Sequence, residues 1–196
     1  MIFFRSSFFR LAMLLLAGML AACSPKPLEF KGSDITGTGL GKDMALTDTS
    51  GQMRRVADYE GKVLVVFFGF TQCPDVCPTA LAELAHAMEM LDEKADDVQV
   101  VLITVDPERD TPELLKEYVT AFDPRFDALR GSADELHKTA QSFRAYYARA
   151  PGSTPDSYTM DHSASFYVFD RKGEPRVLIG GSAEAPDIAD DLRLLL

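Results

Sequence analysis

Residues 63–91 read VLVVFFGFTQCPDVCPTALAELAHAMEML, and this stretch decides the fold. Its beginning, residues 63–70, is continuously apolar and rich in valine and phenylalanine, which is typical of a strand buried on both faces of a sheet. From Pro78 onward the apolar residues recur at helical spacing, and the stripe consists of Leu81, Leu84, Met88 and Leu91. The stretch therefore predicts a buried strand, a turn that contains two cysteines, and an amphipathic helix.

Strand and helix patterns alternate through the rest of the chain. Two short strand patterns, at residues 44–47 and 52–56, flank the turn residues 48–51 and predict an N-terminal hairpin. Further strands are predicted at residues 98–105, 165–170 and 176–179, and further helices at residues 112–122, 136–143 and 188–195. This order predicts an α/β domain with a thioredoxin-like fold: a central mixed sheet flanked by helices, an N-terminal hairpin, and an insertion that contains residues 123–146.

The turn holds two of the chain's three cysteines, Cys73 and Cys77. Because Cys77 directly precedes Pro78, it is predicted to lie at or near the N-cap of the helix, where unpaired amides and positive potential favour thiolate over thiol. Two sulfurs at this spacing can point at one metal ion about 2.3 Å away, but the same spacing permits a disulfide. The cysteine pair alone therefore leaves a soft metal site and a redox switch open.

A histidine far along the chain is the candidate third ligand. His162 is predicted just before a central strand, where a thioredoxin-like sheet brings the chain alongside the cysteine turn. Its neighbours Asp161 and Ser163 are polar, which suits an imidazole held by hydrogen bonds around a metal. The competing interpretation is a structural histidine whose hydrogen bonds are satisfied at a strand end. The residues alone do not decide between this role and metal binding. Two thiolates and an imidazole are ligands for copper and also for zinc.

The first part of the sequence predicts export and attachment to a membrane. Arg5 and Arg10 are followed by an apolar run of about ten residues, too short to span a bilayer comfortably. The run leads into Ala21-Ala22-Cys23, which resembles a bacterial lipobox. We expect residues 1–22 to be a lipoprotein signal peptide and Cys23 to be the lipidation site; an ordinary signal peptide cut near Ala22 is the alternative. The expected location is the bacterial cell envelope, with the domain facing the periplasm or the outer face of the cytoplasmic membrane, where disulfides form.

Composition suggests how the rest of the chain is organised. Prolines and glycines predict a flexible tether at residues 23–42, which leaves residues 43–196 as the domain. The whole chain has a net charge of −10, and residues 1–22 contribute +2, so the chain from Cys23 onward carries −12. Such an acidic surface is a poor binder of nucleic acid. One acidic domain without a coiled-coil pattern predicts a monomer.

Three blocks of sequence together resemble the SCO/SenC family of copper-binding proteins. They are FTQCPDVCPT at residues 70–79, TVDPERDTP at residues 104–112 and YTMDHS at residues 158–163, and they occur in the family's order. The resemblance implies a thioredoxin fold and a copper site made by Cys73, Cys77 and His162. It also implies delivery of copper, as Cu(I) or Cu(II), from an upstream periplasmic donor to the CuA-bearing subunit of cytochrome c oxidase.

Two classes of function fit these residues. The first is a metallochaperone, which is not an enzyme in the strict sense. The alternative is an envelope thiol–disulfide oxidoreductase with Cys73 and Cys77 as the redox-active pair, a role that some members of the family are assigned. The roles of two nearby residues stay open. Asp106 supports the site, faces a partner, or only forms a turn. Met160 either offers a thioether to Cu(I) or, as we expect, packs in the core.

Overall fold

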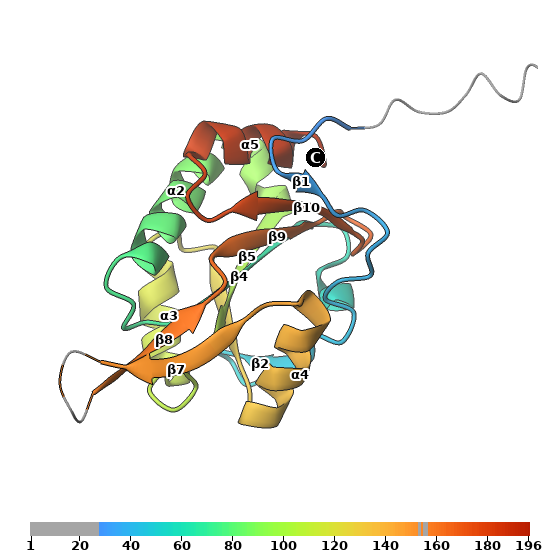
Figure 1. The fold of residues 1–196 in the computed structure, drawn as a ribbon. Helices are drawn as coiled ribbons and strands as arrows, with labels where there is room; N and C mark the ends of the chain where they lie inside the picture. The colour runs from blue at the N-terminus through green and yellow to red at the C-terminus, as the bar shows by residue number, and fades with distance from the viewer. Residues whose placement is uncertain (1–27, 153, 155–156) are drawn as a thin grey trace, which may run out of the picture.

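The computed structural model describes residues 28–152, 154 and 157–196 (Figure 1). Its centre is a sheet with the strand order β1-β10-β9-β4-β5-β6-β2-β3. The strands are β1 (Ser33–Asp34), β2 (Leu46–Asp48), β3 (Met53–Arg54), β4 (Val63–Gly69), β5 (Val98–Thr104), β6 (Asp127–Arg130), β9 (Ser165–Phe169) and β10 (Pro175–Gly180). Strands β4, β5 and β6 are parallel, whereas β9 and β10 are antiparallel to their neighbours. The predicted mixed sheet of the thioredoxin-like type is confirmed, together with the hairpin of β2 and β3.

Helices and a small second sheet complete the domain. The helices are α2 (Val76–Met90), α3 (Pro112–Thr120), α4 (Ala133–Phe143) and α5 (Ala185–Arg193), with short 3-10 helices η1 (Val56–Tyr59) and η2 (Asp92–Asp97). Helices α2 and α5 pack side by side, and β6 and α4 make up most of the predicted insertion (Figure 1). The second sheet is the antiparallel hairpin of β7 (Tyr147–Pro151) and β8 (Tyr158–His162), which projects from the body (Figure 1). The sequence patterns do not predict this hairpin.

Strand β4 supports the centre of the molecule. It is buried at every position, and it lies inside the sheet, with β5 paired to one edge and β9 to the other. Successive side chains alternate between the two faces: the ring of Phe67 contacts Phe166, while that of Phe68 contacts Phe143 and Tyr167. The turn that follows β4 therefore starts from a rigid support.

Residues 31–42, which fall within the predicted flexible tether over residues 23–42, are held against the domain, and the prediction is corrected for this described part. Ser33 and Asp34 pair with β10, and the buried carboxylate of Asp191 accepts the backbone N–H groups of the two residues before β1, at 2.6 and 2.9 Å. Gly41 has a positive φ and touches buried rings, so it serves a tight turn and not flexibility. Burial of Ile35 and Leu40 and these hydrogen bonds hold the segment against the domain.

The predicted signal peptide at residues 1–22 and the predicted lipidation site Cys23 lie outside the described residues. Within the part of the chain that the structure describes, no helix is long and apolar enough to cross a membrane.

Candidate metal centre

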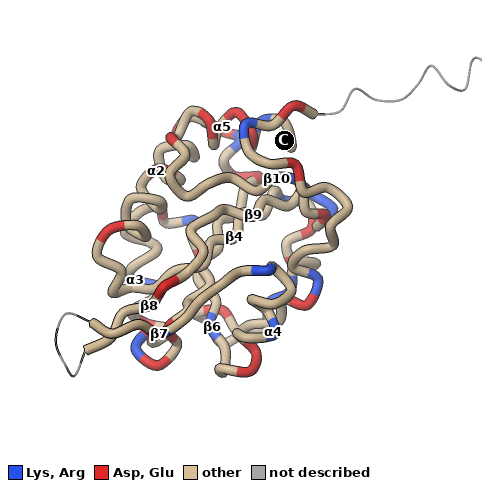
Figure 2. The backbone as a smooth tube through the Cα atoms, viewed as in Figure 1, with Lys and Arg blue, Asp and Glu red and all other residues tan. Residues whose placement is uncertain are grey.

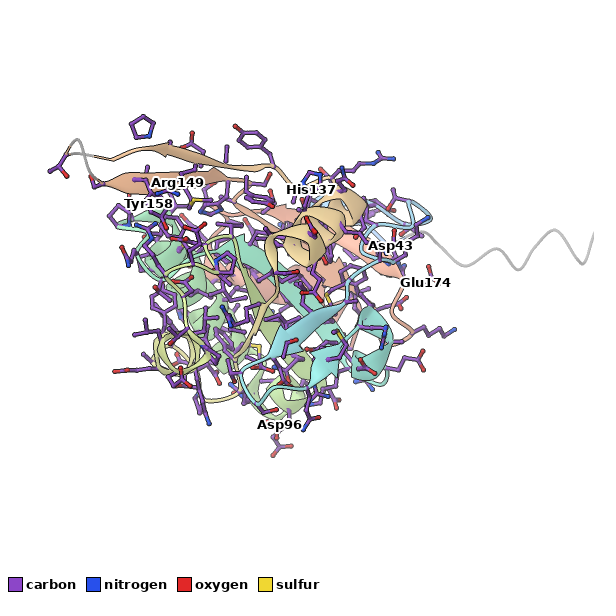
Figure 3. The ribbon with its side chains drawn as sticks, turned by 90° about the horizontal axis from the view of Figure 1, so that it is seen from below. Asp43, Asp96, His137, Arg149, Tyr158 and Glu174 are labelled. Atoms are coloured by element: carbon purple, nitrogen blue, oxygen red, sulfur yellow. The ribbon has the colours of Figure 1, made fainter. Side chains whose placement is uncertain are left out.

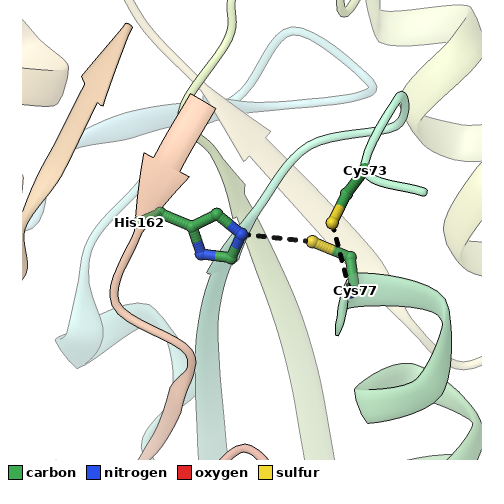
Figure 4. Close-up of side chains that lie close together, drawn as sticks. All are labelled: Cys73, Cys77 and His162. Carbon is green, nitrogen blue, oxygen red and sulfur yellow. Dashed lines mark hydrogen bonds between the residues drawn. The ribbon is translucent and has the colours of Figure 1, made fainter. Parts of the chain in front are cut away.

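The two cysteines of the quoted turn meet at the start of α2 (Figure 4). The helix begins at Val76, two residues before the predicted start, so Cys77 lies inside the first turn and Asp75 is the N-cap. Cys77 is fully buried, whereas Cys73 is half-buried. The backbone N–H of Cys77 donates to the sulfur of Cys73 across 3.4 Å. One end of the helix therefore presents a buried sulfur and a more accessible one.

Gly69, the last residue of β4, makes room for the buried sulfur. A Cβ atom at this position would lie 2.9 Å from Sγ of Cys77, and 3.0 Å from side-chain atoms of Leu102 and Phe67. Real Cβ atoms essentially never approach another atom that closely. The glycine therefore lets the end of the strand lie directly against the thiol.

His162 ends β8 and points its ring at the cysteines (Figure 4). Its Nε2 atom lies 3.5 Å from Sγ of Cys77, and its Nδ1 atom lies 3.1 Å from the backbone carbonyl of Ser163. A carbonyl oxygen only accepts hydrogen bonds, so Nδ1 carries the hydrogen in this contact and the lone pair of Nε2 faces the sulfur. The imidazole is thus oriented as metal-binding histidines are, with its second nitrogen held by the protein.

The three side chains have the spacing and the chemistry of a metal site. Their ligand atoms all lie within 4.8 Å of one another. Metal–sulfur and metal–nitrogen bonds of about 2.3 and 2.0 Å at a tetrahedral angle place the two ligand atoms about 3.5 Å apart, which agrees with the observed 3.5 Å between Sγ of Cys77 and Nε2 of His162. Two thiols and an imidazole suit a soft transition metal such as copper or zinc.

The protonation of Cys77 differs from the prediction. Its position in the first turn of α2 predicts a thiolate, but burial raises the pKa of the Cys77 thiol far above its ordinary value. Loss of water around the sulfur therefore outweighs the positive end of the helix. Without a metal, Cys77 is a thiol that can donate to Nε2 of His162, so metal binding must displace a proton from it.

Aromatic rings wall the site on its inner side. The rings of Phe67 and Phe70 meet the imidazole edge to face, with centroids 6.1 and 5.8 Å away. These contacts limit the rotation of the His162 ring. They also exclude water from the inner side of the buried sulfur, which is the cause of the raised pKa of Cys77.

The outer side of the site is open. A surface pocket of about 290 Å³ is lined by Phe70, Cys73, Pro74, Asp75, Val76, Thr159, Met160, Asp161, His162 and Ala164. Met160 also packs against the core, as the sequence predicts. The half-buried Cys73 and His162 are therefore reachable from this pocket, whereas Cys77 lies behind them.

Other residues of the sequence blocks at 104–112 and 158–163 hold the metal site in place. Asp106 is only 3% exposed and accepts hydrogen bonds from the Tyr158 hydroxyl at 2.9 Å and from Nε of Arg109, so it does more than form a turn. Thr111 is the N-cap of α3, and Asp110 is buried and accepts hydrogen bonds from the hydroxyls of Thr71 and Thr104. Sequence reasoning misses Arg109 and Tyr158 as parts of the site, although both lie in the blocks that carry the family resemblance.

Comparison with known proteins agrees with this geometry. The SCO1/SenC family model matches residues 33–196. A SCO2-like protein of Rickettsia felis is 38% identical over 69% of this chain and 66% of the relative, so the match spans slightly less than two thirds of that relative's length.

Two solved structures are similar in fold and sequence. Bradyrhizobium japonicum ScoI with copper bound has a TM-score of 0.71 and 36% identity, over 84% of this chain and 99% of that one. Apo Sco1 of Thermus thermophilus has a TM-score of 0.75 and 36% identity, over 88% of this chain and the whole of that one. From the match over residues 33–196 and these relatives, the chain belongs to the SCO1/SenC family.

Proposed function

We propose that this protein is a metallochaperone that binds one copper ion through Cys73, Cys77 and His162. The observation that carries the proposal is the convergence of two sulfurs and the Nε2 lone pair within 4.8 Å. Thiolates favour Cu(I), and imidazole also accepts Cu(II), so the three ligands suit both oxidation states. The similarity to a ScoI structure with copper bound supports copper over zinc.

The open side of the site suits delivery of the metal. Three protein ligands leave a coordination position facing the pocket beside Cys73 and His162. A cysteine of a partner enters there, binds the copper, and replaces the protein ligands one after another without a change in oxidation state. Family membership supports the CuA-bearing subunit of cytochrome c oxidase as the recipient, and an upstream periplasmic copper donor loads the site by the same exchange in reverse.

The proposed setting is the outer face of a bacterial membrane. A lipid anchor on Cys23, after removal of residues 1–22, holds a monomeric domain in the periplasm. Because residues 31–42 pack against the domain, the tether is shorter than residues 23–42, and the folded body reaches less far from the anchor than that longer tether would allow. Acidic residues are spread over the body in the view of Figure 2, and the chain has a net charge of −10, which argues against nucleic acid as a partner.

A thiol–disulfide oxidoreductase is the second candidate, because Cys73 and Cys77 are both free and adjacent. In that reaction the thiolate of the accessible Cys73 attacks a partner disulfide and displaces one partner thiolate. The thiolate of Cys77 then attacks the Cys73 sulfur of the mixed disulfide and displaces the second partner thiolate. The partner gains two electrons and this protein keeps a Cys73–Cys77 disulfide. Burial raises the pKa of Cys77, which lowers the fraction of the thiolate needed for the second step. Copper binding needs the same thiolate, but His162, with Nε2 3.5 Å from the Cys77 sulfur, adds a third donor that dithiol exchange does not require, and this favours copper binding as the main role.

The test is copper stoichiometry of the reduced protein under competition with a Cu(I) chelator. We expect one retained copper, lost in His162→Ala and retained in His137→Ala, since His137 is exposed on α4, where its ring hydrogen-bonds to Gln141. Dithiol exchange is expected to survive in His162→Ala. A wild type that retains no copper but cycles a disulfide readily moves the protein to the oxidoreductase class.

A further inference from the structure

The metal ligands come from two parts of the chain that do not share a sheet. The cysteines follow β4 of the large sheet, whereas His162 belongs to the two-stranded sheet of β7 and β8. We propose that Arg109 is a positioning residue that clamps the cysteine turn to the histidine hairpin and so sets the distance between Cys77 and His162. The proposal rests on the proposed function in that it assigns the clamp to copper binding.

The hydrogen bonds of Arg109 reach both parts. Nη1 donates to Oε1 of Gln72, next to Cys73, at 3.1 Å, and to the backbone carbonyl of Tyr158, at the start of β8, at 3.0 Å. Nε donates to the buried carboxylate of Asp106. One guanidinium group therefore joins the cysteine turn, the hairpin and the loop after β5.

The guanidinium of Arg109 also stacks on the ring of Tyr158, the hairpin residue whose carbonyl it binds. The guanidinium carbon of Arg109 lies 3.8 Å from the centroid of the Tyr158 ring and 5.8 Å from that of Phe70. The Tyr158 hydroxyl donates to Asp106 at 2.9 Å, so the ring, the hydroxyl and the carbonyl of this tyrosine are all held. Arg149 on β7 also stacks on the Tyr158 ring, at 3.5 Å (Figure 3).

Fixing Tyr158 fixes the face of β8 that carries the ligand. Residues two apart on a strand share a face, so Tyr158, Met160 and His162 project to the same side. The far end of the hairpin is closed by Tyr146 and Ser163, which exchange hydrogen bonds with each other at 2.9 Å. That closure is internal to the hairpin, whereas the hydrogen bonds of Arg109 run from the hairpin to the cysteine turn.

The fork of the guanidinium is essential to this role. Arginine presents several donors in a plane and stacks on aromatic rings, whereas a lysine ammonium is a single point charge. Arg109→Lys keeps the charge beside Asp106 but cannot reach Gln72 and Tyr158 together. Arg176→Lys is the matched control. The side chain of Arg176, on β10, is 24% exposed, against 21% for Arg109, and it pairs with the carboxylate of Asp170 at 3.0 Å.

Two measurements on the purified protein test the clamp. In the metal-free, reduced state, we expect amide hydrogen exchange in β7 and β8 to accelerate at least about tenfold in Arg109→Lys, with β4 and β5 unchanged and no such effect in Arg176→Lys. In the copper-loaded state, we expect Arg109→Lys to bind copper about 10–100-fold more weakly, as for other residues that orient metal ligands, and to shift the sulfur-to-Cu(II) absorption band.

The results separate the clamp from the proposed function. Unchanged exchange in the hairpin of Arg109→Lys overturns the clamp, whatever happens to copper. Accelerated exchange with unaltered copper affinity and spectrum also overturns it, because the hairpin then moves without disturbing the ligands. If the wild type binds no copper, the proposed function fails, and the clamp as a device for copper binding fails with it. If hairpin exchange then accelerates in Arg109→Lys, Arg109 does hold the hairpin, and the error lies in the metal assignment. If hairpin exchange is unchanged, both the proposed function and the clamp fail.

Discussion

Replacing Gly69 by alanine tests how closely the end of β4 supports the buried sulfur. The added Cβ atom would lie 2.9 Å from Sγ of Cys77, whereas an ordinary contact begins at 3.4 Å. The sulfur or the strand must therefore move by about 0.5 Å, the difference between those two distances. Leu102 and Phe67, both 3.0 Å from the new atom, close the other directions of escape.

The expected loss of stability follows from overpacking a close-packed core. Inserting a methyl group into such a site costs about 1–3 kcal/mol, and each 1 kcal/mol lowers the melting temperature of a domain of this size by about 2–4 °C. The displaced sulfur also changes the 3.5 Å separation between Cys77 and His162. We therefore expect Gly69→Ala to lose both unfolding free energy and copper affinity.

Urea denaturation of the metal-free protein and chelator competition of the copper-loaded protein measure the two effects. Gly180→Ala is the matched control, because Gly180 ends β10 and a Cβ atom there meets nothing within 4 Å. A Gly69→Ala variant as stable as Gly180→Ala, with the copper affinity of the wild type, would refute the placement of the sulfur against β4.

Three further predictions concern charge and burial. Burial raises the pKa of Cys77, so the buried thiol stabilises the fold below about pH 9, and this stabilisation is lost as the pH rises further. Cys77→Ala should weaken the alkaline loss of stability, which denaturation from pH 7 to 10.5 measures. Burial opposes ionisation of Asp48, but hydrogen bonds from its turn and from Arg54 lower the pKa of Asp48 to about 2, so its stabilisation is lost as the pH falls from about 4 to 2. Asp48→Asn should cost about 1–3 kcal/mol at pH 7 and flatten that acid limb of the stability curve. Asp191→Asn replaces one of the two carboxylate oxygens that accept the N–H groups of Lys31 and Gly32 with an NH2 donor. Limited proteolysis should therefore cut residues 28–42 faster than in the wild type, and equal rates would contradict the packed segment.

Local patterns predict the elements that hold the site. The apolar run at residues 63–70 predicts β4 because a central strand is buried on both faces, and the helical stripe after Pro78 predicts α2. Cys73, Cys77 and His162 converge as the family resemblance implies. The hairpin of β7 and β8 is not predicted, because its short strands alternate weakly and pair only with each other.

Effects that depend on distant contacts escape sequence reasoning. The pKa of Cys77 depends on burial beneath Gly69 and the aromatic rings, and not only on its place at the helix start. Strand β1 forms because Ser33 pairs with Leu178, far along the chain, and no local pattern of two residues signals that pairing. The role of Arg109 likewise appears only when Gln72 and Tyr158 lie beside it.

X-ray absorption at the copper edge of the loaded, reduced protein tests the central claim most directly, because it counts the ligands of the bound ion by element. We expect two sulfur ligands at about 2.3 Å and one imidazole nitrogen at about 2.0 Å, with the imidazole signal lost in His162→Ala and kept in His137→Ala. A copper shell without two sulfurs, or an imidazole signal that survives His162→Ala, would contradict the assignment of Cys73, Cys77 and His162 as the copper site.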